Sequence, residues 1–192
     1  MFCRIGINSS PINSIAKIWT IITPENFDKL SLDVLNIGIE SSAVISILVD
    51  LLYKKATNEP KFTALYSRLC LRLCKDIPNF EPSSSNSTTF RNALLIKCQY
   101  EFEKNLPFCY IDDVREKCLG NLRFIAELGR NGLVQEKILH ECVKQLLSSR
   151  SKAIGNNTIP DHPENGEIDQ RTWRYATKEC LCQFLTLIGS YM

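Results

Sequence analysis

The sequence predicts an all-α protein that folds as a solenoid of stacked helix pairs. Apolar residues recur at three- and four-residue intervals along most of its 192 residues, and this is the spacing of one face of an α-helix. No convincing alternating strand of useful length is present. The helices fall into pairs of roughly 35–45 residues, a period typical of helical-repeat proteins.

Three helix pairs and one further helix are expected. The pairs run over residues 12–57, 60–104 and 111–150, and the seventh helix, over about 172–190, has no partner in this scheme. The apolar stripes that define the helices include Ile45, Leu48, Val49 and Leu52; Leu65, Tyr66, Leu69, Cys70 and Leu73; Phe90, Leu94, Cys98 and Phe102; Leu119, Leu122, Ile125 and Ala126; Ile138, Leu139, Cys142, Val143, Leu146 and Leu147; and Leu181, Phe184, Leu185 and Ile188.

The boundaries have recognisable start and stop signals. Thr23 suits the N-cap of a helix and Pro24 its first position, whereas the turn 129–132 has a glycine at each end that can take a positive φ. Residues 1–11 are expected to form a tail before a single domain over 12–192. Residues 151–170 are polar and are expected to form a loop.

Composition excludes several classes of protein. The net charge of +2 argues against a generally basic nucleic-acid-coating protein, and no run of about 18 apolar residues predicts a membrane span. The nine cysteines are odd in number and form no disulfide framework. We therefore expect a cytoplasmic protein with free thiols and no membrane association.

Cys70 and Cys74 raise the question of a metal site. They lie on one helix face, but no second close thiol pair accompanies them, as a zinc site would require. Both follow an apolar stripe, so we interpret them as core residues. Neither His140 nor His162 stands beside a nucleophile motif, and no phosphate-binding loop is present. We expect no metal, no cofactor and no enzymatic activity.

A row of basic residues offers a different possibility. Arg115, Arg123 and Arg130 lie on one side of a predicted helix, and Lys137 and Lys144 share a face of the next. Such a row suits contact with the phosphate backbone of RNA. Acidic residues are interspersed with these basic ones, so charge alone favours an ordinary solvated face.

Several stretches, in this order, resemble the MIF4G domain of the translation initiation factor 4 gamma family, and above all its short, death-associated branch, which supports cap-independent initiation. The resemblance covers about residues 15–190 and rests on "ITPENFDKLSLDVLNIGIESS", "NEPKFTALYSRLCLRLCKDIPNFEP", "STTFRNALLIKCQYEFEK", "CLGNLRFIAELGRNGLVQEKILHECVKQLL" and "KECLCQFLTLIG". It implies a HEAT-type α-solenoid that acts as a non-catalytic scaffold.

The resemblance also implies partners and a docking site. The family binds the DEAD-box helicase initiation factor 4A, and it contacts RNA and initiation factor 3. Its helicase-docking triad corresponds here to Trp19, Ile22 and Phe27. The family domain normally has five helix pairs, so we expect this chain to be incomplete at its C-terminus. The alternatives are an RNA-binding adaptor that does not activate the helicase, and a truncated form that competes for partners or is inactive.

Overall fold

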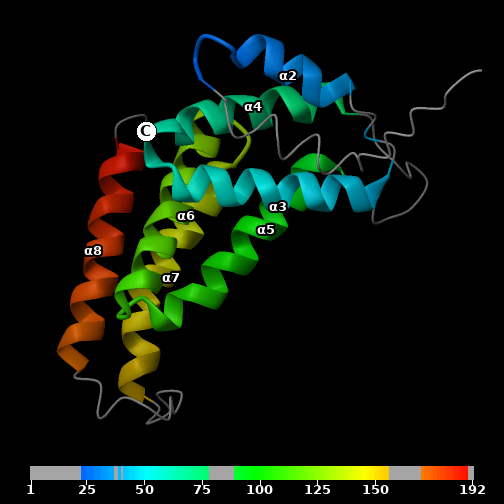
Figure 1. Ribbon diagram of the computed structural model, residues 1–192. Helices are drawn as coiled ribbons and strands as arrows, with labels where there is room; N and C mark the ends of the chain where they lie inside the picture. The colour runs from blue at the N-terminus through cyan, green and yellow to red at the C-terminus, as the bar shows by residue number, and fades with distance from the viewer. Residues whose placement is uncertain (1–22, 37–38, 40, 78–88, 156–169, 190–192) are drawn as a thin grey trace, which may run out of the picture.

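The computed structural model describes residues 23–36, 39, 41–77, 89–155 and 170–189, and Figure 1 shows their arrangement. All regular structure in these ranges is helical, which confirms the predicted all-α class. Within the same ranges, every helix is too short or too polar to cross a membrane.

The helices follow the predicted apolar stripes closely. Short 3₁₀ turns, η1 and η2, precede α4 and follow α5. In chain order the elements are α2 (Phe27–Asn36), α3 (Ser42–Asn58), η1 (Pro60–Phe62), α4 (Thr63–Asp76), α5 (Phe90–Asn105), η2 (Leu106–Phe108), α6 (Asp112–Arg130), α7 (Glu136–Gly155) and α8 (Gln170–Gly189).

The helices stack in two rows. One row contains α4, α6 and α8, which pack against each other in that order, and α2 lies across α4 at the upper edge of the array (Figure 1). The other row contains α3, α5 and α7. In this second row α3 packs closely against α5, whereas α5 and α7 make few backbone contacts. The second row is therefore open between α5 and α7.

The pairing of the helices differs from the predicted one. Among helices that follow one another in the chain, the closest contacts join α3 with α4, α5 with α6, and α7 with α8, so the last helix packs against the helix before it. The prediction paired helices joined by the tight turn after α6. A short turn brings the ends of two helices together, but it does not fix which helices pack along their length. Burial of apolar faces decides that packing instead.

Two predicted boundaries also shift. The N–H of Thr23 donates to Asn26 Oδ1 at 2.7 Å, and the N–H of Asn26 donates back to the Thr23 carbonyl at 3.2 Å. Residues 24–26 therefore form a turn, and α2 begins at Phe27 rather than at Pro24. At the other end, α7 extends to Gly155, into the expected loop. Gly132 takes φ 74° in the turn after α6, whereas Gly129, the other glycine of the predicted turn, lies within α6.

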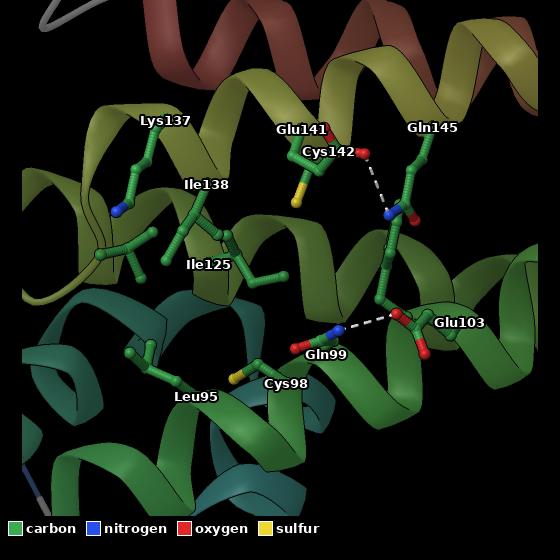
Figure 2. Close-up of a pocket in the computed structure, with 12 residues that line it drawn as sticks. Leu95, Cys98, Gln99, Glu103, Ile125, Lys137, Ile138, Glu141, Cys142 and Gln145 are labelled. Atoms are coloured by element: carbon green, nitrogen blue, oxygen red, sulfur yellow. Dashed lines mark hydrogen bonds between the residues drawn. The ribbon is translucent and has the colours of Figure 1, made fainter.

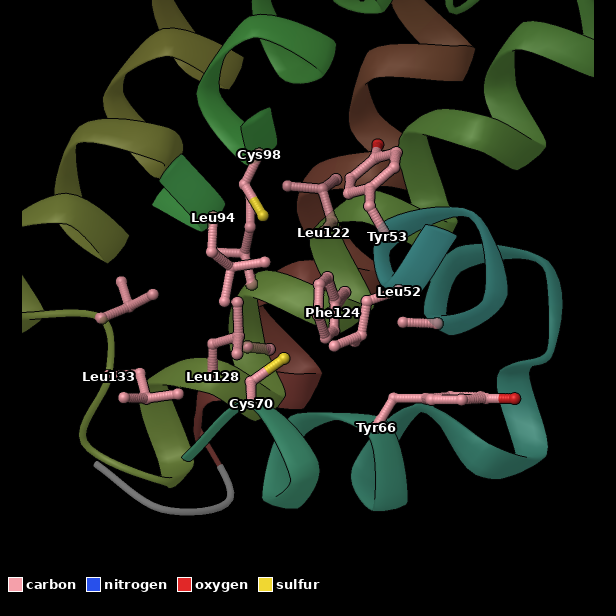
Figure 3. Packing of buried hydrophobic residues seen from close by; sticks show 14 of the residues in the cluster. Leu52, Tyr53, Tyr66, Cys70, Leu94, Cys98, Leu122, Phe124, Leu128 and Leu133 are labelled. Atoms are coloured by element: carbon pink, nitrogen blue, oxygen red, sulfur yellow. The ribbon is translucent and has the colours of Figure 1, made fainter. Parts of the chain in front are cut away.

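A continuous apolar core joins the two rows. Its largest fully buried side chains include Tyr66, Phe124 and Phe184, which come from the row of α4, α6 and α8. The rings of Tyr53 and Phe124 meet edge to face with centroids 6.3 Å apart, so α3 packs directly on α6. Figure 3 shows this junction, with Cys70 and Leu128 beside it.

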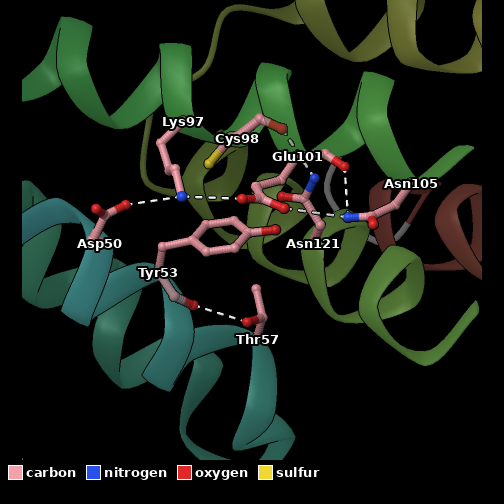
Figure 4. A network of polar contacts seen from close by, with 8 residues as sticks. All are labelled: Asp50, Tyr53, Thr57, Lys97, Cys98, Glu101, Asn105 and Asn121. Carbon is pink, nitrogen blue, oxygen red and sulfur yellow. Dashed lines mark hydrogen bonds and ion pairs between the residues drawn. The ribbon is translucent and has the colours of Figure 1, made fainter. Parts of the chain in front are cut away.

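A polar network fixes α5 against α3 and α6 (Figure 4). Lys97 Nζ lies 2.8 Å from Asp50 Oδ1 on α3 and 3.0 Å from Glu101 Oε1 on α5, above the Tyr53 ring. The Asn121 amide, fully buried on α6, donates to the Cys98 carbonyl at 3.0 Å. These contacts hold α5 in place on its α3 side, opposite the open side of the row.

Candidate interaction surfaces

The predicted docking triad is only partly within the described residues. Trp19 and Ile22 lie outside them. Phe27, the first residue of α2, is 7% exposed and belongs to the apolar core. The guanidinium carbon of Arg68 lies 5.3 Å from the centroid of its ring. Phe27 therefore faces α4 beneath an arginine, and its role as a direct contact for a partner stays a prediction.

Arg68 and Arg72 anchor α2 to α4. Arg68 stacks on Phe27, and one turn later Arg72 Nη1 lies 3.2 Å from Asp28 Oδ1. Arg72 also pairs with Asp76 of its own helix at 3.7 Å. Sequence reasoning missed both arginines. Their four-residue spacing, beside the apolar stripe of α4, indicated that they share one face of that helix. The spacing did not indicate that α2 packs on this face.

The predicted basic row is largely neutralised by acidic neighbours. Arg115 forms an ion pair with Asp112 and reaches Glu179 Oε2 on α8 at 3.3 Å, so it links α6 to α8. Arg130 lies 3.8 Å from Glu127, and Lys144 lies 3.7 Å from Glu141. These three side chains do not form an uncompensated positive track, because each lies beside a carboxylate.

Arg123 and Lys137 differ from the other three basic residues. Among the described residues, neither has an acidic side chain within ion-pair distance. Arg123 is half-buried on α6, and Lys137 is exposed at the start of α7. Lys137 borders the space between α5 and α7, whereas Lys144 borders a separate, open hollow on α7. The structure therefore does not bring the five predicted residues together on one surface.

The thiols are packing residues, as predicted. Cys70 is fully buried, and Cys74 is partly buried against the same core. Burial raises the pKa of Cys70 well above its ordinary value and raises that of Cys74 to about 11. Both therefore stay protonated at neutral pH, which disfavours nucleophilic or metal-binding roles. In the described ranges, no cluster of three or more metal-ligating side chains occurs.

The open side of the α5 row forms a groove, shown in Figure 2. The groove has a volume of about 360 Å³ and lies between α5 and α7, with α6 as its floor. The Cys98 and Cys142 side chains point into it from opposite walls (Figure 2). Burial raises the pKa of Cys142 to about 11, so its thiol acts as an apolar surface. Sequence periodicity did not indicate this groove, because periodicity marks the apolar faces of helices and not the gaps between helices.

A two-row array of helices with an anchored edge helix and an open groove defines a helical-repeat scaffold, a class that works by presenting surfaces to other macromolecules. Within that class, the chain belongs to the MIF4G domain family, whose match runs over residues 13–192.

Similar proteins are translation initiation factors. The chain is 37% identical over 191 residues to eukaryotic translation initiation factor 4 gamma 2 of Homo sapiens, covering 88% of this chain and 19% of that protein. It is 30% identical over 189 residues to eukaryotic translation initiation factor 4G of Triticum aestivum, covering 88% of this chain and 11% of that protein. The chain thus spans a fifth or less of the length of these relatives.

A solved structure supports the fold. The MIF4G domain of Trypanosoma cruzi translation initiation factor EIF4G5 superposes with a TM-score of 0.65 at 18% identity, covering 93% of this chain and 77% of that chain. At this identity the likeness concerns the fold, and it agrees with the predicted HEAT-like solenoid.

Proposed function

We propose that this chain is a cytoplasmic, non-catalytic scaffold of translation initiation that binds the DEAD-box helicase initiation factor 4A and supports initiation of the cap-independent type. Family membership supports the general role, and the 37% identity to initiation factor 4 gamma 2 favours that branch. Trp19, Ile22 and Phe27 are the proposed helicase contacts. The work of such a scaffold is to raise the effective concentration of partners and to orient them.

The anchoring of α2 is the observation that carries this proposal. Phe27 and Asp28 fix the start of α2 on α4 through Arg68 and Arg72. A docking segment needs such a rigid base, because each side chain ordered on binding reduces affinity. We propose that Phe27 positions the segment from within the core, while Trp19 and Ile22 supply the direct contacts.

Capture of purified initiation factor 4A by immobilised protein tests the proposal. The double variant Trp19→Ala/Ile22→Ala should lose most of the captured helicase, while Ile96→Ala should capture as much as the wild type. Ile96 is the matched control because it is a large apolar side chain, 66% exposed, on a different helix. Equal capture by the double variant and the wild type would sink the idea.

Phe27→Ala needs separate treatment because the side chain is buried. Removing a buried phenylalanine costs about 3–5 kcal/mol in well-packed cores, so loss of binding could follow from loss of α2. Circular dichroism and thermal unfolding of this variant must accompany the capture assay. Reduced capture by a variant that keeps the wild-type melting temperature would indicate a direct contact.

We also propose that the chain contacts mRNA and initiation factor 3. Arg123 and Lys137 are the leading candidates for RNA, because the other proposed basic residues, Arg115, Arg130 and Lys144, lie beside carboxylates. RNA affinity should fall steeply as salt rises, and Arg123→Gln/Lys137→Gln should reduce both the affinity and its salt dependence. Absent or salt-independent binding would contradict this contact.

Helicase stimulation distinguishes the scaffold from a competing or inactive form. A productive scaffold raises the ATPase rate of initiation factor 4A, whereas a competitor captures the helicase without raising that rate. Measuring both quantities with the same preparations, beside a MIF4G domain of a longer family member, separates the two possibilities.

A further inference from the structure

We infer that the groove between α5 and α7 is a second docking site, which takes a short amphipathic helix of a partner protein. The partner helix carries apolar residues on one face, a basic residue at one end and an acidic residue at the other. The lining residues of this site differ from the proposed helicase contacts, and the inference does not depend on the proposed helicase contact.

The floor and walls of the groove are apolar. Ile125 of α6 lies at the floor, Leu95 of α5 forms one wall, and Ile138 of α7 forms the other (Figure 2). The two thiols that point into the groove, Cys98 and Cys142, are protonated and add apolar surface. Such a surface recognises apolar side chains by burial rather than by hydrogen bonding.

The dimensions suit about two turns of helix. Along α5 the groove extends from Leu95 to Glu103, a rise of eight residue steps or about 12 Å of helix. A helix of that length presents three apolar residues on one face, at positions i, i+4 and i+7. The volume of about 360 Å³ suits a few inserted side chains and lies at the small end of the range for drug-sized ligands.

The charges at the rim select the ends of the occupant. Lys137 stands at one end of the groove and Glu103 at the other (Figure 2). Glu103 accepts a hydrogen bond from Gln99 at 2.9 Å, and in the described part of the chain neither Glu103 nor Lys137 has an ion-pair partner. An occupant with opposite charges at its two ends pairs with both, which a small apolar molecule does not do.

A designed peptide provides the probe. It is a stapled helix of three turns with leucines at i, i+4 and i+7, a lysine at one end and a glutamate at the other. Titration into isotope-labelled protein should shift the methyl signals of Leu95, Ile125 and Ile138. The Ile96 methyl signals should not move, because Ile96 lies on α5 but faces away from the groove lining and is exposed.

Charge reversal at the rim tests selectivity. Glu103→Lys places a lysine at both ends of the groove. Whichever way the lysine–glutamate peptide lies in the groove, its own lysine then faces a lysine, so its affinity should fall by about tenfold. The same variant should then prefer a peptide with glutamate at both ends. Glu103 is exposed, so the substitution leaves the core intact, and Trp19→Ala/Ile22→Ala should bind the first peptide like the wild type.

Three results would overturn the inference. One is the absence of methyl shifts at millimolar peptide. Another is binding that is equal for all peptides whatever the rim charge, which would mark a pocket for any small apolar group. The third is a concentration-dependent shift of the groove methyls without peptide, which would identify a second copy of the chain as the occupant.

Discussion

Gly120 sets the distance between α3 and α6, and Gly120→Ala tests how closely these helices must approach. A Cβ at Gly120 would lie 2.6 Å from the carbonyl oxygen of Thr57 and 3.3 Å from its carbonyl carbon and Cα. These are backbone atoms of α3, so no side-chain rotation relieves the contact. Restoring an ordinary contact of 3.4 Å requires a separation of about 0.8 Å (3.4 − 2.6).

The free-energy cost of moving the helices apart opposes the stabilisation that alanine gives through its higher helix propensity. Alanine in place of glycine in a helix interior stabilises by about 1 kcal/mol, whereas overpacking a core costs about 1–3 kcal/mol and sometimes more. A gap of this size also weakens the van der Waals contacts between α3 and α6, including that of Tyr53 with Phe124. Because the clash is with backbone, the overpacking cost should lie near its upper end, so we expect a net loss of about 2 kcal/mol (about 3 less about 1) in the free energy of unfolding.

Urea unfolding followed by far-UV circular dichroism measures this loss. Gly189→Ala is the matched control, because Gly189 ends α8 and no atom of the described residues lies within 4 Å of a Cβ placed there. The control should leave stability unchanged or raise it slightly. If Gly120→Ala proves as stable as the wild type, α3 and α6 do not pack as closely as described and the reasoning fails.

Three further predictions concern two buried thiols, a buried amide and the arginine that covers Phe27. Burial raises the pKa of Cys118 from 9.0 to about 12 and that of Cys142 to about 11. The stability that each protonated thiol contributes is therefore complete below pH 9, and it falls as the pH rises from 9 to about 12 for Cys118 and to about 11 for Cys142. Unfolding under reducing conditions should show a loss of about 1 kcal/mol per thiol for one pH unit above 9, and Cys142→Ala should remove part of it. Asn121 has a buried Oδ1 that finds no hydrogen-bond partner among the described residues. Asn121→Leu should therefore lower the free energy of unfolding by less than about 1 kcal/mol, whereas Asn121→Asp, which buries a charge near Glu101, should lower it by several kcal/mol. Equal denaturation midpoints for the two variants would contradict this. Arg68→Ala should cost about 0.5–1 kcal/mol through lost contact with the Phe27 ring and loosen α2 in hydrogen exchange, and unchanged protection of α2 would refute the anchoring role.

The sequence was sufficient to predict the helices and most of the core. Stripes such as Leu48 with Leu52 and Leu69 with Leu73 mark buried faces, and the structure buries all four residues completely. Periodicity succeeds here because a helix face is a local property of the chain. The turn at Gly132 was predictable for the same reason, since its positive φ favours glycine.

The arrangement of the helices required tertiary information. The prediction paired α6 with α7 through their short turn, but the close partner of α7 is α8, across a long connection. The Lys97 network and the buried Asn121 were also missed, because polar residues inside a helix pattern normally face solvent. The groove exists because α5 and α7 make few contacts with each other, which periodicity along the sequence does not reveal.

Phe27 illustrates the limit for the functional site. A phenylalanine at the start of a helix has the same hydrophobicity whether it docks a partner or fills the core, so a sequence motif cannot separate the two roles. The structure buries Phe27 against α4 beneath Arg68. Little of its side chain is left for a partner to contact, and this favours a positioning role over a direct contact. In the proposed scaffold the two readings differ in one measurable respect: a positioning residue alters helicase capture only together with the order of α2, whereas a contact residue alters capture alone.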